Sequence, residues 1–249
     1  MRRRDFMATT AAAGILAAAS SIPFALSRGA KSTDNSPSTE TATDNGKLIA
    51  PAKGRIPVAF AISQGVTVID FAGPWEVFQD VMLKGRGGEM GQMPFQLFTV
   101  AENTEPITAS AGLKLIPDYT FETAPQPKVL VVPAQRGSAA LHEWLRKASR
   151  ATDVTMSVCT GAFQLAAAGL LSGKAATTHH EYQDSLAGKY PTIDVKRGVR
   201  FVEGERISSA GGLTSGIDLA LRVVERYFGR EVAQTTADYM EYQSKGWIV

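Results

Sequence analysis

Apolar residues follow two alternating patterns along the chain, one typical of buried strands and the other of helices. Short apolar or alternating runs predict strands at residues 55–62, 95–100, 128–133 and 154–158. Apolar positions at helical spacing predict helices at 68–78, 141–148, 162–171 and 214–228. Strands that alternate with helices of about 10–15 residues predict a parallel sheet covered on both faces. We therefore expect an α/β three-layer sandwich with a mostly parallel central sheet.

Weaker patterns fill the intervals between these elements. Residues 106–115 predict a small hairpin around Ser110-Ala111, and residues 176–178 and 199–202 predict short strands. Residues 207–212 lead into the last helix. Pro74 is expected near the first turn of its helix, where a proline is tolerated. Residues 240–249 are expected to pack on the domain or on a partner.

The N-terminus has the pattern of an export signal. Clustered arginines precede a short stretch of small apolar residues. The segment from Arg3 to Met7 resembles a twin-arginine signal, so residues 1–27 are predicted to be a signal peptide, cleaved after Ser27. Residues 28–53 are polar and predict a disordered tether. Residues 54–249 then have a length that suits one domain. We therefore expect a periplasmic or otherwise exported protein, with no membrane contact after cleavage.

Composition narrows the function classes. The chain is 44% hydrophobic and 20% charged, as in ordinary globular proteins, with a net charge of +2. No basic stripe interleaved with aromatics occurs, so a nucleic-acid partner is not expected. His179-His180-Glu181 is the one metal-like triplet, but adjacent residues rarely converge on one ion. We predict neither a metal nor a cofactor.

Cys159 is the only cysteine of 249 residues and lies between a predicted strand and a predicted helix. A lone cysteine is either a small buried core residue or a thiol kept for its reactivity. Export favours the reactive thiol, because structural cysteines are usually paired in disulfides in an oxidising compartment such as the periplasm. Unpaired N–H groups at the helix start are expected to stabilise the thiolate.

Several candidate residues follow predicted strands or precede helices. These are Asp70, residues 133–137, Cys159 and Gly211-Gly212. In open parallel sheets ligands bind at the carboxyl ends of the strands. The topology therefore brings these residues to one edge and favours a functional Cys159.

Two motifs, Ser157-Val158-Cys159-Thr160-Gly161 and Ala176-Thr177-Thr178-His179, resemble the ThiJ/PfpI superfamily, the class I glutamine amidotransferase-like group. The segments 68–78 and 210–218 extend the resemblance to residues 55–235. It implies a flavodoxin-like fold with a nucleophile elbow at Cys159, and a homodimer. The isonitrile hydratase branch and the amidase-like domain of AraC-type regulators are most similar. The regulators carry a C-terminal helix-turn-helix region, whereas this sequence ends at Val249, soon after the last predicted core helix.

The resemblance implies the site residues. Cys159 matches the family nucleophile, Asp70 the acid beside it, and Thr160 the residue after it. His179 falls where many members place a histidine near the sulfur, and it can bind substrate or water. Gly73, Ala134 and Gln135 complete the predicted substrate-binding set. Alternative roles stay open: Asp70 as a helix cap or turn residue, Thr160 as a first-turn residue, and His179 as a packed or surface histidine.

Two departures from the family pattern bear on function. Thr160 after the cysteine disfavours peptidase activity. Where the family usually has Pro-Gly-Gly, this chain has Pro133-Ala134-Gln135-Arg136-Gly137. Without the two glycines, this loop has fewer positive-φ conformations in which it could donate N–H groups to an oxyanion. The side chain of Arg136 could bring a positive charge to the pocket instead.

Three functions remain in competition. The first is an isonitrile hydratase-like lyase that converts a small electrophilic substrate into an N-substituted formamide through Cys159. The second is a glyoxalase- or deglycase-like activity on 2-oxoaldehydes. The third is a non-catalytic periplasmic protein that binds a small ligand or responds to redox state.

Overall fold

The computed structural model describes residues 46–83 and 93–249. The predicted signal peptide and residues 28–45 of the predicted tether lie outside this range. The strands are β1 (Ile56–Ala61), β2 (Phe95–Ala101), β3 (Ile107–Thr108), β4 (Lys114–Leu115), β5 (Tyr119–Thr120), β6 (Val129–Val132), β7 (Val154–Val158), β8 (Ala175–Ala176), β9 (Asp194–Val195), β10 (Phe201–Val202) and β11 (Ile207–Ala210). The α-helices are α1 (Val68–Gln79), α3 (Ala139–Ala148), α4 (Gly161–Ala167), α5 (Gln183–Lys189), α6 (Ser215–Phe228) and α7 (Arg230–Tyr239). Short 3₁₀ turns are η1 (Ser110–Gly112), η2 (Ser149–Ala151) and η3 (His180–Tyr182).

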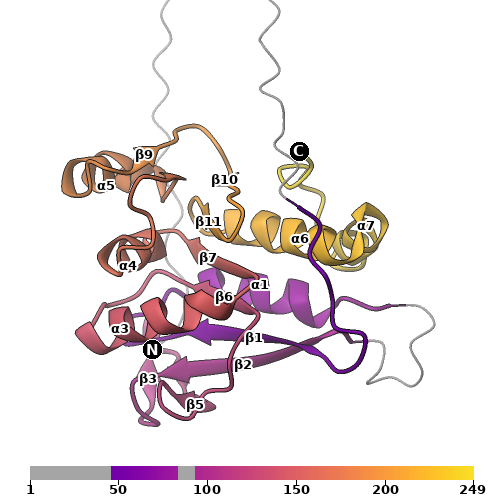
Figure 1. The fold of residues 1–249 in the computed structure, drawn as a ribbon, viewed down its shortest axis with the longest axis horizontal. Coiled ribbons are helices and arrows are strands. Elements are labelled where there is room, and N and C mark those ends of the chain that lie inside the picture. Colours follow the sequence, from indigo (N-terminus) through magenta and orange to yellow (C-terminus); the bar gives the residue numbers. More distant parts are fainter. Residues whose placement is uncertain (1–45, 84–92) are drawn as a thin grey trace, which may run out of the picture. The chain divides into compact units, whose positions relative to one another are not determined.

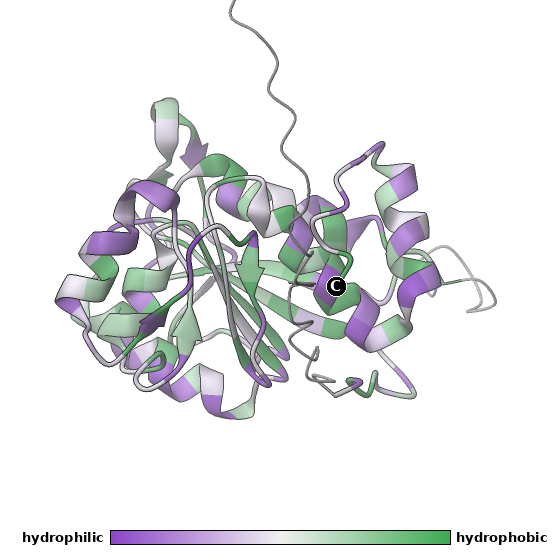
Figure 2. Ribbon diagram, turned by 90° about the horizontal axis from the view of Figure 1, so that it is seen from above, coloured by the Kyte–Doolittle hydropathy of each residue, from purple (hydrophilic) through white to green (hydrophobic). Residues whose placement is uncertain are grey.

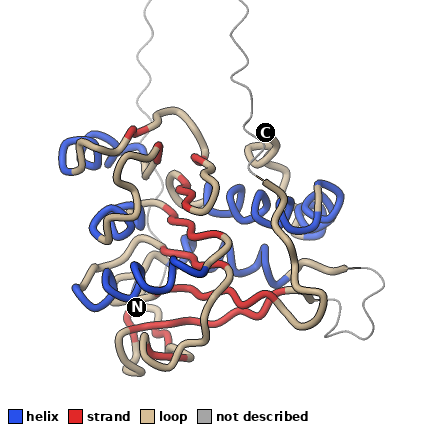
Figure 3. Tube along the Cα trace, viewed as in Figure 1, coloured by secondary structure: helices blue, strands red, loops and turns tan. Residues whose placement is uncertain are grey.

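The central sheet has seven strands in the order β10-β11-β7-β6-β1-β2-β5. All neighbouring pairs are parallel except β10 and β11. Helices cover both faces, as Figures 1 and 3 show: α1, α6 and α7 pack on one face and α3, α4 and α5 on the other. The predicted three-layer α/β sandwich with a mostly parallel sheet is confirmed.

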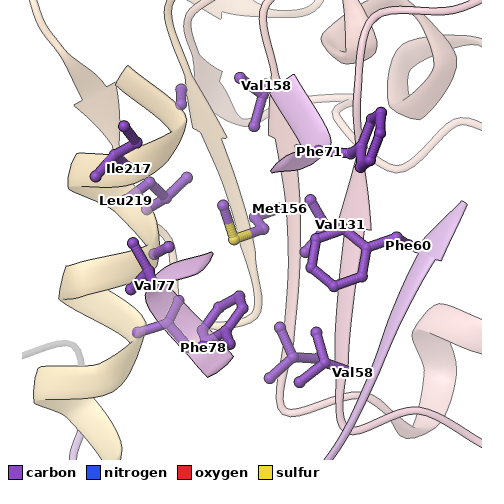
Figure 4. Packing of buried hydrophobic residues seen from close by; sticks show 14 of the residues in the cluster. Val58, Phe60, Phe71, Val77, Phe78, Val131, Met156, Val158, Ile217 and Leu219 are labelled. Atoms are coloured by element: carbon purple, nitrogen blue, oxygen red, sulfur yellow. The ribbon is translucent and has the colours of Figure 1, made fainter. Parts of the chain in front are cut away.

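Successive residues of each central strand contribute to opposite cores. In β1, Val58 and Phe60 belong to the α1/α6 core, whereas Ala59 and Ala61 belong to the α3/α4 core. Because both faces of such a strand are buried, it reads as a continuous apolar run. Figure 4 shows the first core, in which Val58 and Phe60 lie beside residues of β6, β7, α1 and α6. Figure 2 shows the same division, with apolar segments inside and polar segments outside.

Helices α1 and α6 approach each other closely. A side chain at Gly73 would meet Ile217 Cγ1 at 2.9 Å, and one at Gly216 would meet both Val158 methyl groups at 2.9 Å. Pro74 lies inside α1 rather than near its first turn, because the helix begins at Val68 and continues to Gln79. Gly73 therefore permits the spacing between α6 and the helix that carries Asp70, and Gly216 permits the spacing between α6 and β7.

Some local predictions were wrong. The helix predicted at 162–171 ends at Ala167, because the chain forms a C-cap in which Gly169 has φ +76°. The N–H groups of Gly169 and Leu170 donate to the carbonyls of Ala166 (2.9 Å) and Leu165 (2.9 Å). Residues 177–178 are not a strand: β8 ends at Ala176 and pairs with β9 outside the central sheet. The predicted strand at 199–202 shortens to β10, and α5 and α7 were not predicted.

Segments at both ends of the described chain pack on the domain. The Leu48 N–H donates to the carbonyl of Arg226 at 2.8 Å, and Leu48 and Ala50 contact the core. Packing therefore begins before residue 54, where the domain boundary was predicted. Trp247 is fully buried, so the C-terminal residues pack on the domain itself. Among the helices described, none is long and apolar enough to cross a membrane.

Candidate active site

The candidate nucleophile lies on a sharp turn between β7 and α4. Cys159 has φ +57°, a left-handed conformation that residues with a side chain rarely adopt. Its N–H donates to the carbonyl of Gly211 at 2.8 Å, and its own carbonyl accepts the Thr178 hydroxyl at 2.8 Å. Such strain persists only where the surroundings hold it in place. The geometry is that of the predicted elbow.

Gly161 is what allows the helix after the elbow to start so close to the sheet. A Cβ at this position would lie 2.0 Å from the carbonyl oxygen of Val132, the last residue of β6. Backbone atoms cannot yield as a flexible side chain can, so a side chain is excluded there. The Cys-Thr-Gly motif thus has a packing requirement at its third position.

Asp70 lies in the first turn of α1 and is completely buried. Its Oδ2 accepts the N–H of Ala134 at 3.2 Å. In return, the carbonyl of Ala134 accepts the N–H of Thr67, the cap residue of α1, at 2.9 Å. These bonds join the start of α1 to the loop after β6. The carboxyl group also interacts with the thiol of Cys159, while its buried Oδ1 has no geometric hydrogen-bond partner among the described residues.

The carboxyl and the thiol perturb each other. Burial raises the pKa of Asp70 to about 6, against the opposing hydrogen bonds from Ala134 and Cys159. Burial is also the main cause that raises the pKa of Cys159 to about 11, and the charge of Asp70 adds to it. The N–H groups of Thr160 and Leu213 lower that pKa but are outweighed. The N–H of Thr160 at the helix start thus favours the thiolate, as predicted, but desolvation and the charge of Asp70 outweigh it, so the pKa of Cys159 is raised overall.

The pair therefore has a defined protonation state near neutral pH. With a pKa of about 6, Asp70 is mostly a carboxylate at pH 7, and Cys159 is a thiol. A carboxylate with a pKa close to the working pH is a suitable general base. The arrangement can move the thiol proton to Asp70 as the sulfur attacks.

The loop that departs from the family pattern is held by side chains instead of glycines. Gln135 donates from Nε2 to the carbonyl of Ala61 at 2.8 Å. Its Oε1 is buried and has no hydrogen-bond partner in the described part of the chain. Ala134 is buried and supplies the N–H that Asp70 accepts. Arg136 is exposed at the surface rather than turned into a buried pocket.

A polar pair behind this loop was not predicted. Gln164 of α4 donates from Nε2 to the carbonyl of Gln135 at 3.1 Å, and its Oε1 lies 2.9 Å from Nε2 of His142. His142 is half-buried, not the surface histidine that its amphipathic helix suggests. A side chain at Gly137 would lie 2.3 Å from the Gln164 Oε1. Helices α3 and α4 thus brace the loop.

His179 lies against Gly212, in the loop between β11 and α6. Its Nδ1 accepts the N–H of Glu181 at 3.4 Å, and a side chain at Gly212 would meet its Cδ2 at 2.3 Å. It borders a cavity of about 340 Å³ whose other lining residues include His180, Arg200 and Leu213. The cavity adjoins the loop whose Leu213 N–H acts on Cys159. A substrate-binding role for His179 remains a prediction.

The remaining candidates have different surroundings. Thr160 precedes α4 and makes no side-chain cap bond, and its N–H acts on the thiol of Cys159. Gly73 lies at the α1–α6 contact, where the structure gives it a packing role. Leu213, whose φ is +53°, was not predicted, because positive φ is rare for a residue with a bulky side chain and nothing in the sequence indicates it here. In the described ranges, no three His, Cys, Asp or Glu residues gather where they could hold a metal ion.

Comparison with known proteins assigns the class that this fold and elbow suggest. The DJ-1/PfpI family model matches residues 57–226, so the chain belongs to the DJ-1/PfpI family. It is 33% identical to isonitrile hydratase from Pseudomonas putida over 196 residues, 75% of this chain and 78% of that protein. It is 35% identical to the transcriptional regulator CdhR from Pseudomonas aeruginosa, over 51% of this chain but 39% of the regulator.

Solved structures agree on the fold. A ThiJ/PfpI family protein from Pseudomonas syringae has a TM-score of 0.67 and 26% identity, covering 86% of this chain and 83% of that one. An AraC family regulator from Pseudomonas putida has a TM-score of 0.64 at 18% identity, covering 74% of this chain and 99% of that one. The predicted superfamily, with isonitrile hydratase and AraC-type regulators as relatives, is confirmed.

Proposed function

We propose that this protein hydrates a small isonitrile to an N-substituted formamide, with Cys159 as nucleophile and Asp70 as the proton carrier. The observation that carries the proposal is the buried pair itself. A strained elbow presents the thiol to a fully buried carboxyl group whose pKa is about 6. The similarity to isonitrile hydratase supports the choice of substrate class.

The first step forms a bond between sulfur and the terminal carbon of R–N≡C. Asp70 takes the thiol proton as the sulfur attacks and returns it to that carbon, which gives the thioimidate R–N=CH–S–Cys159. The N–H groups of Thr160 and Leu213 stabilise the negative charge on sulfur during the transfer.

The second step uses one water molecule. Water adds to the thioimidate carbon, and Asp70 accepts one of its protons and delivers it to the nitrogen. The carbon–sulfur bond then breaks, the departing sulfur takes up the other water proton, and R–NH–CHO leaves. The buried Oε1 of Gln135, which lacks a donor among the described residues, supports a role in accepting an N–H or O–H during this step.

Activity assays test the proposal directly. The purified protein should hydrate cyclohexyl isocyanide, and Cys159→Ala and Asp70→Asn should each lose at least about 100-fold in kcat/KM. Asp184→Asn, whose side chain is 93% exposed, is the matched control for losing one carboxylate and should keep full activity. Turnover of methylglyoxal without turnover of the isonitrile would replace the proposal with the 2-oxoaldehyde chemistry.

A second candidate function is ligand binding without turnover. The raised pKa of Cys159, about 11, favours it, because very little thiolate exists at neutral pH. Several relatives are transcriptional regulators, which also supports a sensory use of the domain. If wild-type protein hydrates neither substrate but its Tm rises with an isonitrile or formamide, this function is the correct one.

We further propose export by the twin-arginine route. The motif that begins at Arg3-Arg4 supports it. Replacing both arginines by lysine should retain the full-length chain in the cytoplasm, as cell fractionation would detect. Unchanged distribution between the fractions would refute this route.

A further inference from the structure

The loop between β11 and α6 carries a donor that acts on the nucleophile. Leu213 has φ +53° and is 44% exposed, yet its N–H acts on the thiol of Cys159. A γ-branched residue in the left-handed region is strained, and an exposed one has few contacts of its own to hold it. Something else in the fold must fix this loop.

Backbone bonds hold the loop at several points. The carbonyl of Gly212 accepts the N–H of Ser215, and the carbonyl of Leu213 accepts the N–H of Gly216, each at 3.1 Å. The carbonyl of Gly211 accepts the N–H of Cys159 at 2.8 Å, and the N–H of Gly211 donates to the carbonyl of Arg200 at 2.9 Å. The strained residue lies two positions further along. Thr214, the residue after Leu213, is the one that side chains from other segments contact by hydrogen bonds.

Arg200 connects that end of the loop to a buried carboxylate. Its Nη2 donates to Oγ1 of Thr214 at 3.1 Å, and its Nε donates to Oδ2 of Asp218 at 2.6 Å. Asp218 lies in α6 and is completely buried, so the guanidinium is the charge that compensates it. If the ion pair were lost, the buried carboxylate of Asp218 would be left without a compensating charge. The cost of that loss holds Arg200 in its position.

The C-terminal segment completes the same cluster. The Tyr242 hydroxyl lies 3.2 Å from Oδ1 of Asp218 and 3.4 Å from the carbonyl oxygen of Thr214. The Ser244 hydroxyl donates to the same Oδ1 at 3.1 Å but does not contact the loop. The fully buried Trp247, whose indole donates to the carbonyl of Ser244 at 3.1 Å, anchors the segment.

We propose that Asp218, Arg200 and Tyr242 are positioning residues that hold the N–H of Leu213 against the sulfur of Cys159. The C-terminal segment 240–249 thereby takes part in the site without touching the substrate. This inference rests on the proposed function only in treating Cys159 as the nucleophile.

Alkylation of the single cysteine tests the inference without any need for turnover. Tyr242→Phe keeps the ring and the net charge but removes the three hydroxyl contacts, with Asp218, Thr214 and Arg200. Asp70, the titratable group that interacts with the thiol, stays in place. We expect the iodoacetamide rate constant at about pH 8.5 to fall about 3- to 10-fold, since each unit of thiol pKa changes the thiolate fraction tenfold.

The direction of the change in alkylation rate distinguishes loss of the N–H donor from a general loosening of the loop. A loosened loop would expose the buried sulfur and accelerate alkylation, whereas a lost N–H donor slows it. Ser244→Ala is the matched control, because it removes a bond to the same carboxylate without touching the loop, and it should change the rate by less than about twofold. An equal or faster rate in Tyr242→Phe than in Ser244→Ala overturns the inference. If Tyr242→Phe does not fold by circular dichroism, the exposed Thr214→Val decides by the same criterion.

Discussion

Asp70 is expected to lower the free energy of unfolding of the protein at neutral and higher pH, where its carboxyl group is ionised. Its pKa is raised from 3.8 to about 6, mainly by burial, a difference of about 2.2 units. At about 1.36 kcal/mol per unit, this corresponds to about 3 kcal/mol. Because the folded-state pKa lies above the unfolded value, the favourable contribution is complete below about pH 3.8. It is lost as pH rises through about 6.

Asp70→Asn should therefore stabilise the protein near pH 8 and not near pH 4. The amide has the shape of the carboxyl, so its oxygen can still accept the Ala134 N–H. We expect the free energy of unfolding, from urea titrations, to rise by about 1–3 kcal/mol at about pH 8, with the gap closing toward about pH 4. A destabilised variant at pH 8, or a gap of the same size at both pH values, would refute the reasoning.

The same substitution should make the thiol more reactive while it abolishes catalysis. The charge of Asp70 raises the pKa of Cys159, and Asn removes that charge. Iodoacetamide should then react up to about 10-fold faster with the variant at about pH 8.5. Asp184→Asn, an exposed carboxylate, is the control and should change neither alkylation nor the pH dependence of stability.

Two further predictions concern the elbow. Thr178→Val removes the buried hydroxyl that donates to the Cys159 carbonyl, so unfolding free energy should fall by about 1–3 kcal/mol in the same titrations; an unchanged value would mean that this bond does not hold the turn. Gly161→Ala should prevent accumulation of folded protein, because its Cβ would meet the Val132 carbonyl, whereas Gly188→Ala, with open space in α5, should raise Tm slightly. Normal folding of Gly161→Ala would show that the strand end can move.

The sequence alone was sufficient to predict the three layers, the mostly parallel sheet and the turn that carries Cys159. Runs such as that of β1 are apolar at every position only when both faces are buried, and a strand followed at once by a helix brings Cys159 to the carboxyl edge. The proximity of Asp70 to Cys159 came from the family resemblance together with that edge. The spacing of the two residues along the chain does not indicate that proximity.

Other features depend on contacts between distant segments. Asp218 is one acidic residue in an amphipathic helix, and nothing nearby in sequence indicates that Arg200 and Tyr242 will surround it. The effect of the Thr160 N–H on the pKa of Cys159 could be predicted because the helix start is visible in the sequence, whereas the larger, opposite effect of desolvation is not. Helix α7 was missed because Gly229, at φ +89°, reads as an end although the chain turns there and continues as a helix.

The tight contact between α1 and α6 has a consequence for redesigning what the site accepts. A side chain at Gly73 would meet Ile217 of α6 at 2.9 Å, so a substitution there would shift α1, the helix that carries Asp70, or α6. The cavity beside His179 has a different wall: its border includes His180 of η3 and Val199 of the loop before β10, both of them exposed. On the prediction that His179 binds substrate, randomising that wall should change which substrates are accepted, whereas the contact between α1 and α6 should be left unchanged.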